Sequence, residues 1–217
     1  MNKSFPILAI ETTGELCSVA LLLDEKNFIE LNHLQKHIHS EKLIEMIDIV
    51  MRQAAISLKD CSCIAISMGP GSFTGLRIGM SAVKGLAFGS NLGIVPVPTF
   101  SALALQISQF IQSGQKFNLV TNASIDDCYF AKYSVVDGKL ENNFQLTLLE
   151  KDNLDKNIFA EEINFGNIIS EKYFIRDVKL SAISIARWVY LFGKDLLTFE
   201  YDNLEPNYLK QFVGKVK

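Results

Sequence analysis

The chain has 217 residues, of which 48% are apolar and 21% are charged, and its formal net charge is −3. A chain of this length can bury one large hydrophobic core or two smaller ones. Its net negative charge gives no electrostatic footprint for direct nucleic-acid binding. These values favour a globular protein whose partners are not recruited by a basic surface.

Cysteine usage and hydropathy favour a soluble cytoplasmic protein. The four cysteines are Cys17, Cys61, Cys63 and Cys128. They form no C-x-x-C pair and no zinc-ligand spacing, which favours reduced, mostly buried thiols. The apolar stretch 93–111 is interrupted by two prolines and a glutamine, so no membrane span is expected.

The first half of the chain alternates strand-like and helix-like patterns. Its expected elements, in chain order, are strands 7–10, 17–23 and 28–31, a helix 40–55, a strand 64–68, a helix 76–88, a strand 93–97 and a helix 99–112. The first three strands form a meander, because short turns rich in Gly, Asp and Asn separate them. Ser40 is expected to cap the helix that follows.

The second half begins again with strands. These are expected at 117–121, 128–136 and 144–149, and a helix capped by Ser181 runs to about residue 197; residues 150–175 give no clear pattern. This restart predicts an α/β fold with two lobes. The expected lobes are residues 1–105, with the glycine loop and two helices, and residues 106–217, which form a smaller and less regular lobe.

A glycine-rich motif, Gly69-Pro-Gly-Ser-Phe-Thr-Gly-Leu-Arg-Ile-Gly79, joins a strand to a helix. Such a unit can bind phosphate through backbone N–H groups at the helix N-terminus. However, it lacks the Lys and Ser/Thr of a Walker loop, and Arg77 lies one turn into the helix. We therefore favour a structural role, in which small residues let the helix approach the sheet. The structural glycines are Gly69, Gly71, Gly75 and Gly79.

An ordered set of motifs gives the chain a family resemblance. The motifs are Ile7-Leu-Ala-Ile-Glu-Thr-Thr13, Cys17-Ser-Val-Ala20, His39-Ser-Glu41, the glycine motif and Ala82-Val-Lys-Gly-Leu-Ala87. Together they resemble the TsaB (YeaZ) family of bacterial threonylcarbamoyladenosine tRNA modification. The resemblance covers residues 5–105, is thin between 122 and 200, and returns at Pro206-Asn-Tyr-Leu-Lys210.

The resemblance implies an actin-like (ASKHA) fold and a non-catalytic partner role. The expected partners are a TsaD-like catalytic paralogue, a TsaE-like ATPase that joins the complex, and a second copy of the chain through the same helices. Contact with tRNA would be only indirect, and no cofactor is expected. Three positions depart from the family: Glu11 stands where an aspartate is usual, and Asn122 and Ser124 stand where the family has Asp and Arg.

Other chemistries have weaker support in the residues. Glu11 could be a residual acidic site, but acceptance of N–H bonds from Thr13 or Gly14 is the favoured role. His33 and His37 have i,i+4 spacing without further ligands, so no metal site is expected. An actin-fold ATPase or small-molecule kinase is the alternative function. A metallopeptidase ("glycoprotease") is less favoured, because neither a histidine set nor a nucleophile motif is visible.

Two helices are expected to form a docking face. Apolar residues cover about half the circumference of helix 40–55, and helix 76–88 carries a run of small residues. The helix could be wedged inside one core, but we favour a helix that serves its own sheet and a partner together. The predicted interface residues are Leu43, Met46, Ile47, Ile49, Val50, Arg77, Met80, Ala82 and Val83.

Overall fold

The structure is a computed structural model, and it describes residues 5–209. The chain divides into two compact units. Among the described residues, unit 1 contains 5–106 and 179–206, and unit 2 contains 107–178 and 207–209. The first division follows Gln106, and residues 179–206, expected in the second lobe, belong to unit 1. The apolar face of their helix is buried against the sheet of unit 1.

Unit 1 is built on a mixed five-stranded sheet. Its strands are β1 (Ile7–Glu11), β2 (Leu16–Leu22), β3 (Phe28–Leu34), β4 (Cys63–Ser67) and β5 (Ile94–Val97), in the order β3-β2-β1-β4-β5. The strands β1, β2 and β3 form the predicted antiparallel meander, and β4 and β5 run parallel to β1. β1 and β4 are buried throughout, which explains their continuous apolar runs.

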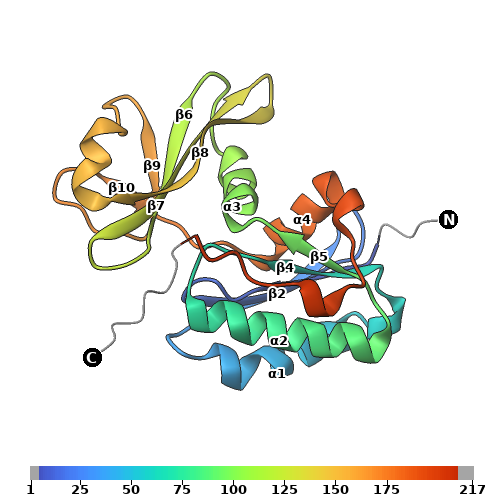
Figure 1. Cartoon of the computed structure of the whole chain (residues 1–217). Coiled ribbons are helices and arrows are strands. Elements are labelled where there is room, and N and C mark those ends of the chain that lie inside the picture. Colours follow the sequence, from blue (N-terminus) through green and yellow to red (C-terminus); the bar gives the residue numbers. More distant parts are fainter. Residues whose placement is uncertain (1–4, 210–217) are drawn as a thin grey trace, which may run out of the picture. The chain divides into compact units, whose positions relative to one another are not determined.

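Helices cover both faces of this sheet. The helices of unit 1 are α1 (His39–Gln53), α2 (Phe73–Ser90), α3 (Thr99–Ser108, which continues two residues past the unit boundary) and α4 (Ala182–Phe192), with the 3-10 helices η1 (Leu58–Asp60), η3 (Lys194–Leu196) and η4 (Tyr201–Asn203). α1 and α2 lie side by side on one face (Figure 1), and α4 contacts the strands from the other face. The main core of unit 1 lies between the sheet and the pair α1 and α2.

The two long helices begin in different ways. Ser72 caps α2, because its Oγ accepts the N–H of Gly75 at 3.2 Å, and Asn91 ends that helix in the left-handed region. α1 begins at His39, so the predicted cap at Ser40 is wrong. Ile38 takes the N-cap position, is 5% exposed, and accepts the N–H groups of residues 41 and 42 through its carbonyl. The N-cap residue is therefore the buried Ile38, two residues before the expected cap at Ser40.

Unit 2 repeats the sheet topology of unit 1. Its strands are β6 (Lys116–Asn122), β7 (Asp127–Val136), β8 (Lys139–Glu150), β9 (Ile163–Gly166) and β10 (Ile175–Asp177), in the order β10-β9-β6-β7-β8. β6, β7 and β8 form an antiparallel meander, and β9 and β10 run parallel to β6. The sequence shows no internal repeat, so the duplication is visible only in the topology.

Several element ends differ from the sequence-based expectation. β8 covers 139–150 rather than 144–149, and the unassigned segment 150–175 contains the 3-10 helix η2 (Lys151–Lys156), β9 and the start of β10. α3 ends at Ser108, and α4 ends at Phe192, about five residues before the expected position. Ser181 is the N-cap residue of α4, but its side chain makes no capping hydrogen bond. No helix among the described residues is long and apolar enough to cross a membrane.

Candidate functional site

Glu11 ends β1 and is almost completely buried, with 1% of its surface exposed. Its Oε1 atom accepts hydrogen bonds from the backbone N–H and from the hydroxyl of Thr13. The predicted acceptance of the Thr13 N–H is therefore confirmed. The other carboxyl oxygen, Oε2, and the Oγ atom of Ser67 at the end of β4 are buried and have no hydrogen-bond partner among the described residues.

Burial changes the protonation of this carboxyl. It raises the pKa of Glu11 to about 7, and the nearby Ser67 hydroxyl and the hydrogen bonds from Thr13 act in the opposite direction. A carboxyl with this pKa carries a proton part of the time at neutral pH. Because the side chain is enclosed, it is not placed to hold a metal-bound water in front of a nucleotide.

The glycine loop packs directly on the residues that follow Glu11. Ser72 donates its N–H to the Thr13 carbonyl at 2.7 Å, and the Thr12 hydroxyl donates to the Gly75 carbonyl at 2.8 Å. A Cβ atom at Gly75 would stand 1.9 Å from the Thr12 carbonyl oxygen, and one at Gly79 would stand 2.3 Å from Thr12 Oγ1. At these two positions, any larger residue would force the start of α2 away from the end of β1.

Three of the N–H groups in and beside the loop donate to protein acceptors. The N–H of Gly69 donates to Thr99 Oγ1 at 2.9 Å, the N–H of Ser72 donates to Thr13, and the N–H of Gly75 donates to Ser72 Oγ. A phosphate-binding loop presents such groups to the ligand. In this loop, protein acceptors take three of them, and Gly71 is held against Thr13.

The histidines do not form a helical pair. His33 lies on β3, His37 lies between the elements with a φ of 63°, and His39 is the first residue of α1. The i,i+4 spacing of His33 and His37 therefore does not bring their rings onto one helix face. Within residues 5–209, no group of three or more His, Cys, Asp or Glu side chains is arranged to hold a metal ion.

Most of the residues of the predicted docking face are buried in this chain. Six of its nine residues have exposed fractions of 5% or less and belong to the core of unit 1: Leu43, Met46, Ile47, Val50, Met80 and Val83. These six side chains are therefore largely hidden in the single chain, and their contact with a partner stays a prediction. The apolar arc of α1 is wide because that helix contacts β2, β3 and α2 together. This is the single-core alternative that the sequence left open.

Three predicted residues remain accessible, and others on the same helices are more exposed. Arg77 is exposed, and Ile49 and Ala82 are partly exposed. Ile44 on α1 and Phe88 on α2 are 57% and 80% exposed. A Cβ atom built at Gly85 or Gly89 meets nothing within 4 Å, so these glycines face open space, whereas Gly75 and Gly79 face β1. In the sequence, the only trace of this face is an aromatic residue, Phe88, that stands between two glycines, Gly85 and Gly89. That Phe88 is exposed and that the glycines face open space is visible only in the structure.

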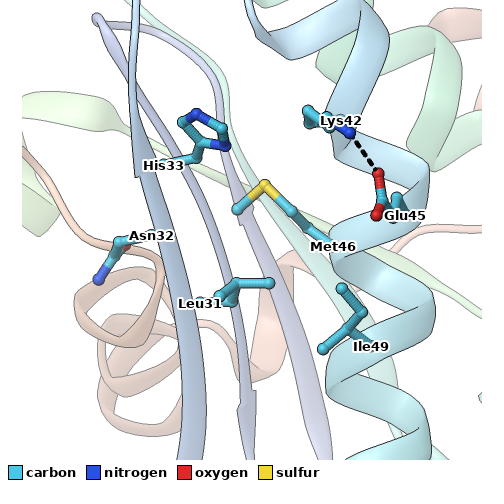
Figure 2. A pocket seen from close by; sticks show the side chains of 7 residues that line it. All are labelled: Leu31, Asn32, His33, Lys42, Glu45, Met46 and Ile49. Atoms are coloured by element: carbon cyan, nitrogen blue, oxygen red, sulfur yellow. Dashed lines mark hydrogen bonds and ion pairs between the residues drawn. The ribbon is translucent and has the colours of Figure 1, made fainter.

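Ile49, one of the predicted interface residues, lies on the side of α1 that faces β3 (Figure 2). It lines a groove with Leu31 and Met46. A charge at Ile49 would therefore disturb this groove before it disturbed a surface on the outer side of α1.

The unusual Asn122-Ala-Ser124 segment supports a turn within unit 2. Asn122 donates its N–H to Asn167 Oδ1 at 2.8 Å, and the Ser124 hydroxyl donates to Asp127 Oδ2 at 2.9 Å. Lys151 adds a hydrogen bond from its Nζ to the Ser124 carbonyl. At the positions where the resemblance implies a charged pair, this chain has two neutral residues that form local hydrogen bonds.

Known proteins are similar to this chain in sequence and in fold. A family model described as "TsaD: tRNA N6-adenosine threonylcarbamoyltransferase" matches residues 26–163. The protein named tRNA threonylcarbamoyladenosine biosynthesis protein TsaB of Haemophilus influenzae is 33% identical over 143 residues, which cover 65% of this chain and 58% of that relative. Its namesake in Buchnera aphidicola is 34% identical over 145 residues, which cover 67% of this chain and 65% of the relative. The match thus spans less than two thirds of either relative.

The solved structure of YeaZ from Pseudomonas aeruginosa has the same fold. It aligns with a TM-score of 0.76 and 24% identity, and the alignment covers 94% of this chain and 99% of that chain. The two α/β units with repeated sheet topology confirm the expected actin-like fold class. The chain belongs to the TsaD-type family of tRNA threonylcarbamoyladenosine proteins and, within it, to the TsaB (YeaZ) group.

Proposed function

We propose that this chain is a non-catalytic partner of a TsaD-type threonylcarbamoyltransferase, acting in the cytoplasm in the formation of threonylcarbamoyladenosine in tRNA. The observation that carries the proposal is its membership of a group whose relatives are named for this biosynthesis. A TsaE-like ATPase would join through the complex, and tRNA would be contacted through the partner.

The site around Glu11 supports a role without catalysis. Phosphoryl transfer depends on positioned N–H groups and cations that neutralise the phosphates. In this chain three loop N–H groups bond to protein acceptors, and the Arg77 guanidinium stacks on the Phe73 ring at 3.9 Å from its centroid. An ATPase or kinase acting alone is therefore the weaker proposal.

The outer faces of α1 and α2 are the proposed docking surface. It consists of Ile44, Arg77, Gly85, Phe88 and Gly89. A glycine inside a helix costs about 1 kcal/mol relative to alanine. Gly85 has no neighbour inside the chain that would forbid a Cβ atom, so its own fold does not require glycine. A helix of the TsaD-type partner, or of a second copy, that packs closely against α2 at this point would explain why the residue is glycine.

The test is reconstitution of the modification reaction. It combines the TsaD-type enzyme, the ATPase, the synthase that supplies the carbamoyl-adenylate, and tRNA, with this chain present or omitted. We expect modification to require this chain and to fail with Gly85→Trp, which fills the docking surface, whereas Gly85→Ala, which adds a single methyl group, should reduce it less. Full modification without this chain would overturn the proposal. So would steady ATP hydrolysis by this chain alone that disappears in Glu11→Ala.

A further inference from the structure

The carboxyl of Glu11 is enclosed only a few residues away from exposed backbone. Glu11 and Thr12 are buried, and Thr13 is 7% exposed, but Gly14 and Glu15 at the tip of the same turn are exposed. A Cβ atom built at Gly14 meets nothing within 4 Å. The β1–β2 turn (residues 12–15) therefore covers Glu11 with a short stretch of chain that is itself open to water on its outer side.

The groups that face Glu11 are neutral. Ser67 of β4 and the turn residues Thr13 and Gly14 offer hydroxyl or N–H groups, and these lower its pKa less than burial raises it. The thiol of Cys17 on β2 also feels this carboxyl, and burial raises the pKa of that thiol to about 11, so it is neutral at pH 7. Among the described residues, no cation forms an ion pair with Glu11, and its Oε2 atom has no hydrogen-bond partner. The ionised form is therefore an uncompensated buried charge.

Hydrogen bonds connect Glu11 to the start of α2. Glu11 Oε1 accepts the N–H and the hydroxyl of Thr13, and the Thr13 carbonyl accepts the N–H of Ser72 at 2.7 Å. Ser72 is the N-cap residue of α2. The Thr12 hydroxyl adds a second connection, because it donates to the Gly75 carbonyl at 2.8 Å. Movement of the turn would release both connections and leave the first turn of α2 without its anchor on β1.

We propose that Glu11 is a proton-dependent switch: with its proton it keeps the β1–β2 turn closed on the glycine loop, and without it the turn opens and frees the first turn of α2. Opening lets water reach the carboxylate and so removes the cost of the buried charge. The rest of α2 stays in place, because Met80, Val83 and Ala87 belong to the core of unit 1. The opening is therefore local.

The switch gives docking a direction of pH dependence. This step rests on the proposed function, in which the outer face of α2, including Arg77, contacts a TsaD-type partner. A partner that requires the ordered start of α2 binds the closed turn, and closing the turn takes up a proton when Glu11 is ionised. With a pKa of about 7, most closed chains are ionised at pH 8 and few are at pH 6. Association should therefore weaken as the pH rises above 7.

The first test measures amide hydrogen exchange of the full chain between pH 5 and pH 8. It compares the parent chain with Glu11→Gln, which cannot ionise, so the intrinsic pH dependence of exchange and the titration of other groups cancel. At the N–H of Ser72, the parent should exchange faster than the variant by a few-fold at pH 5 and by on the order of 300-fold at pH 8. This limit follows because the ordinary pKa of 4.5 and the folded-state pKa of about 7 differ by about 2.5. A ratio that does not change with pH would overturn the proposal.

A reference amide separates local opening from global unfolding. The N–H of Ile64 in the buried strand β4 donates to the Gly93 carbonyl at 3.0 Å. It should exchange much more slowly than the N–H of Ser72, and low concentrations of urea should accelerate it more, because its exposure requires more surface to unfold. Equal rates and equal urea dependence at the two positions would also overturn the proposal.

Ser67→Ala tests whether the effect comes from titration rather than packing. The Ser67 hydroxyl favours the ionised form of Glu11, so its loss should raise the pKa of the carboxyl further. In the parent, the equilibrium constant for opening at Ser72 should level off near pH 7, and in Ser67→Ala it should level off at higher pH. A variant that changes this constant by the same factor at every pH would show a packing effect alone and would contradict the switch.

The last test measures docking by titration calorimetry with the TsaD-type enzyme at pH 6 and pH 8. The parent chain and Glu11→Gln should bind alike at pH 6, and the parent should bind several-fold more weakly than the variant at pH 8. Equal affinities of the two chains at pH 8 would overturn the control of docking by Glu11. Absence of binding by both chains at both pH values would instead contradict the proposed function, and hydrogen exchange would still decide whether the switch exists.

Discussion

The carboxylate of Glu30 on β3 accepts the backbone N–H of Ile183 on α4 at 2.9 Å, although 153 residues separate the two. Ser18 on β2 adds a second contact, because its Oγ accepts the N–H of Ala182 at 2.8 Å. Two strand residues thus satisfy N–H groups at the start of α4, where Ser181 makes no capping bond. This arrangement fixes α4 on the sheet of unit 1.

We expect Glu30→Ala to lower the free energy of unfolding by about 1–2 kcal/mol, as loss of a helix cap does. Glu30→Gln keeps an acceptor oxygen and should cost less, about 0.5 kcal/mol, through lost attraction to the helix N-terminus. Ser181→Ala is the control and should have almost no effect. Urea unfolding measures all three, and a Ser181→Ala variant as unstable as Glu30→Ala would contradict this account of the cap.

Glu11 should make stability depend on pH near neutrality. Burial raises its pKa in the folded chain to about 7, above its ordinary value of 4.5. The folded state therefore binds the proton more tightly than the unfolded state does. This contribution to stability is complete below about pH 4.5 and is lost as the pH rises through 7, a change on the order of 3 kcal/mol.

The variant Glu11→Gln keeps the side-chain shape and cannot ionise. Relative to the parent chain, we expect it to unfold at higher urea concentration at pH 8, with an advantage that shrinks toward pH 5 and approaches zero near pH 4. Urea curves at these pH values measure the difference, which cancels the contribution of unrelated groups. A difference that does not change with pH would show that folding does not raise the pKa of this carboxyl.

Two glycines of α2 should respond in opposite ways to the same substitution. At Gly75 a Cβ atom would stand 1.9 Å from the Thr12 carbonyl oxygen, so Gly75→Ala should cost several kcal/mol or prevent folding. At Gly85 nothing lies within 4 Å of the added atom, so Gly85→Ala should stabilise the isolated chain by up to about 1 kcal/mol. Thermal unfolding compares the two variants. Equal losses at both positions would contradict the finding that Gly75 faces β1 while Gly85 faces open space.

A largely buried ion pair should stabilise unit 2. The Lys132 Nζ atom lies 2.7 Å from Glu162 Oε1, and their side chains are 12% and 8% exposed. Burial favours the neutral form of Glu162, but hydrogen bonds from Lys132, Asn118 and the Phe159 N–H outweigh it and lower the pKa of the carboxyl. Its contribution is therefore present above the ordinary pKa and is lost as the pH falls through the lower folded-state pKa.

Glu162→Gln should cost about 2–4 kcal/mol at pH 7, because it leaves the Lys132 charge without its partner. The double change Lys132→Met with Glu162→Leu should cost less than the sum of the two single changes. Urea unfolding of Lys132→Met, Glu162→Leu, the double variant and the parent chain completes this double-mutant cycle. Strict additivity would indicate that the two side chains do not interact in solution.

Sequence reasoning placed most elements of unit 1 and their type. Alternating and continuous apolar runs indicated the meander, β4 and β5, and the motif at 69–79 indicated a tight connection into α2. The same reasoning did not foresee that six of the nine predicted interface residues belong to the core of unit 1. Leu43 and Val50 are apolar for the internal core, and periodicity alone cannot tell a wide internal face from an external one.

The second unit was harder to anticipate. Its short strands β9 and β10 have four and three residues, too few for a periodic pattern to stand out among polar neighbours. Three features depend on residues that are distant in the chain or lie on different elements. They are the helix cap by Glu30, the groove beside Leu31 and the burial of Glu11. No local pattern reports such contacts.

The sequence by itself determined the family, the α/β fold class, the order of the main elements and the need for small residues in the glycine loop. These properties depend on local spacing and on motifs that are contiguous in the chain. Only the tertiary structure decided that α4 returns to unit 1, that most apolar residues of α1 face inward, and that the β3 edge stays open. Those outcomes depend on which surfaces are already covered by distant segments, because burial and edge pairing are properties of the assembled sheet rather than of any one segment.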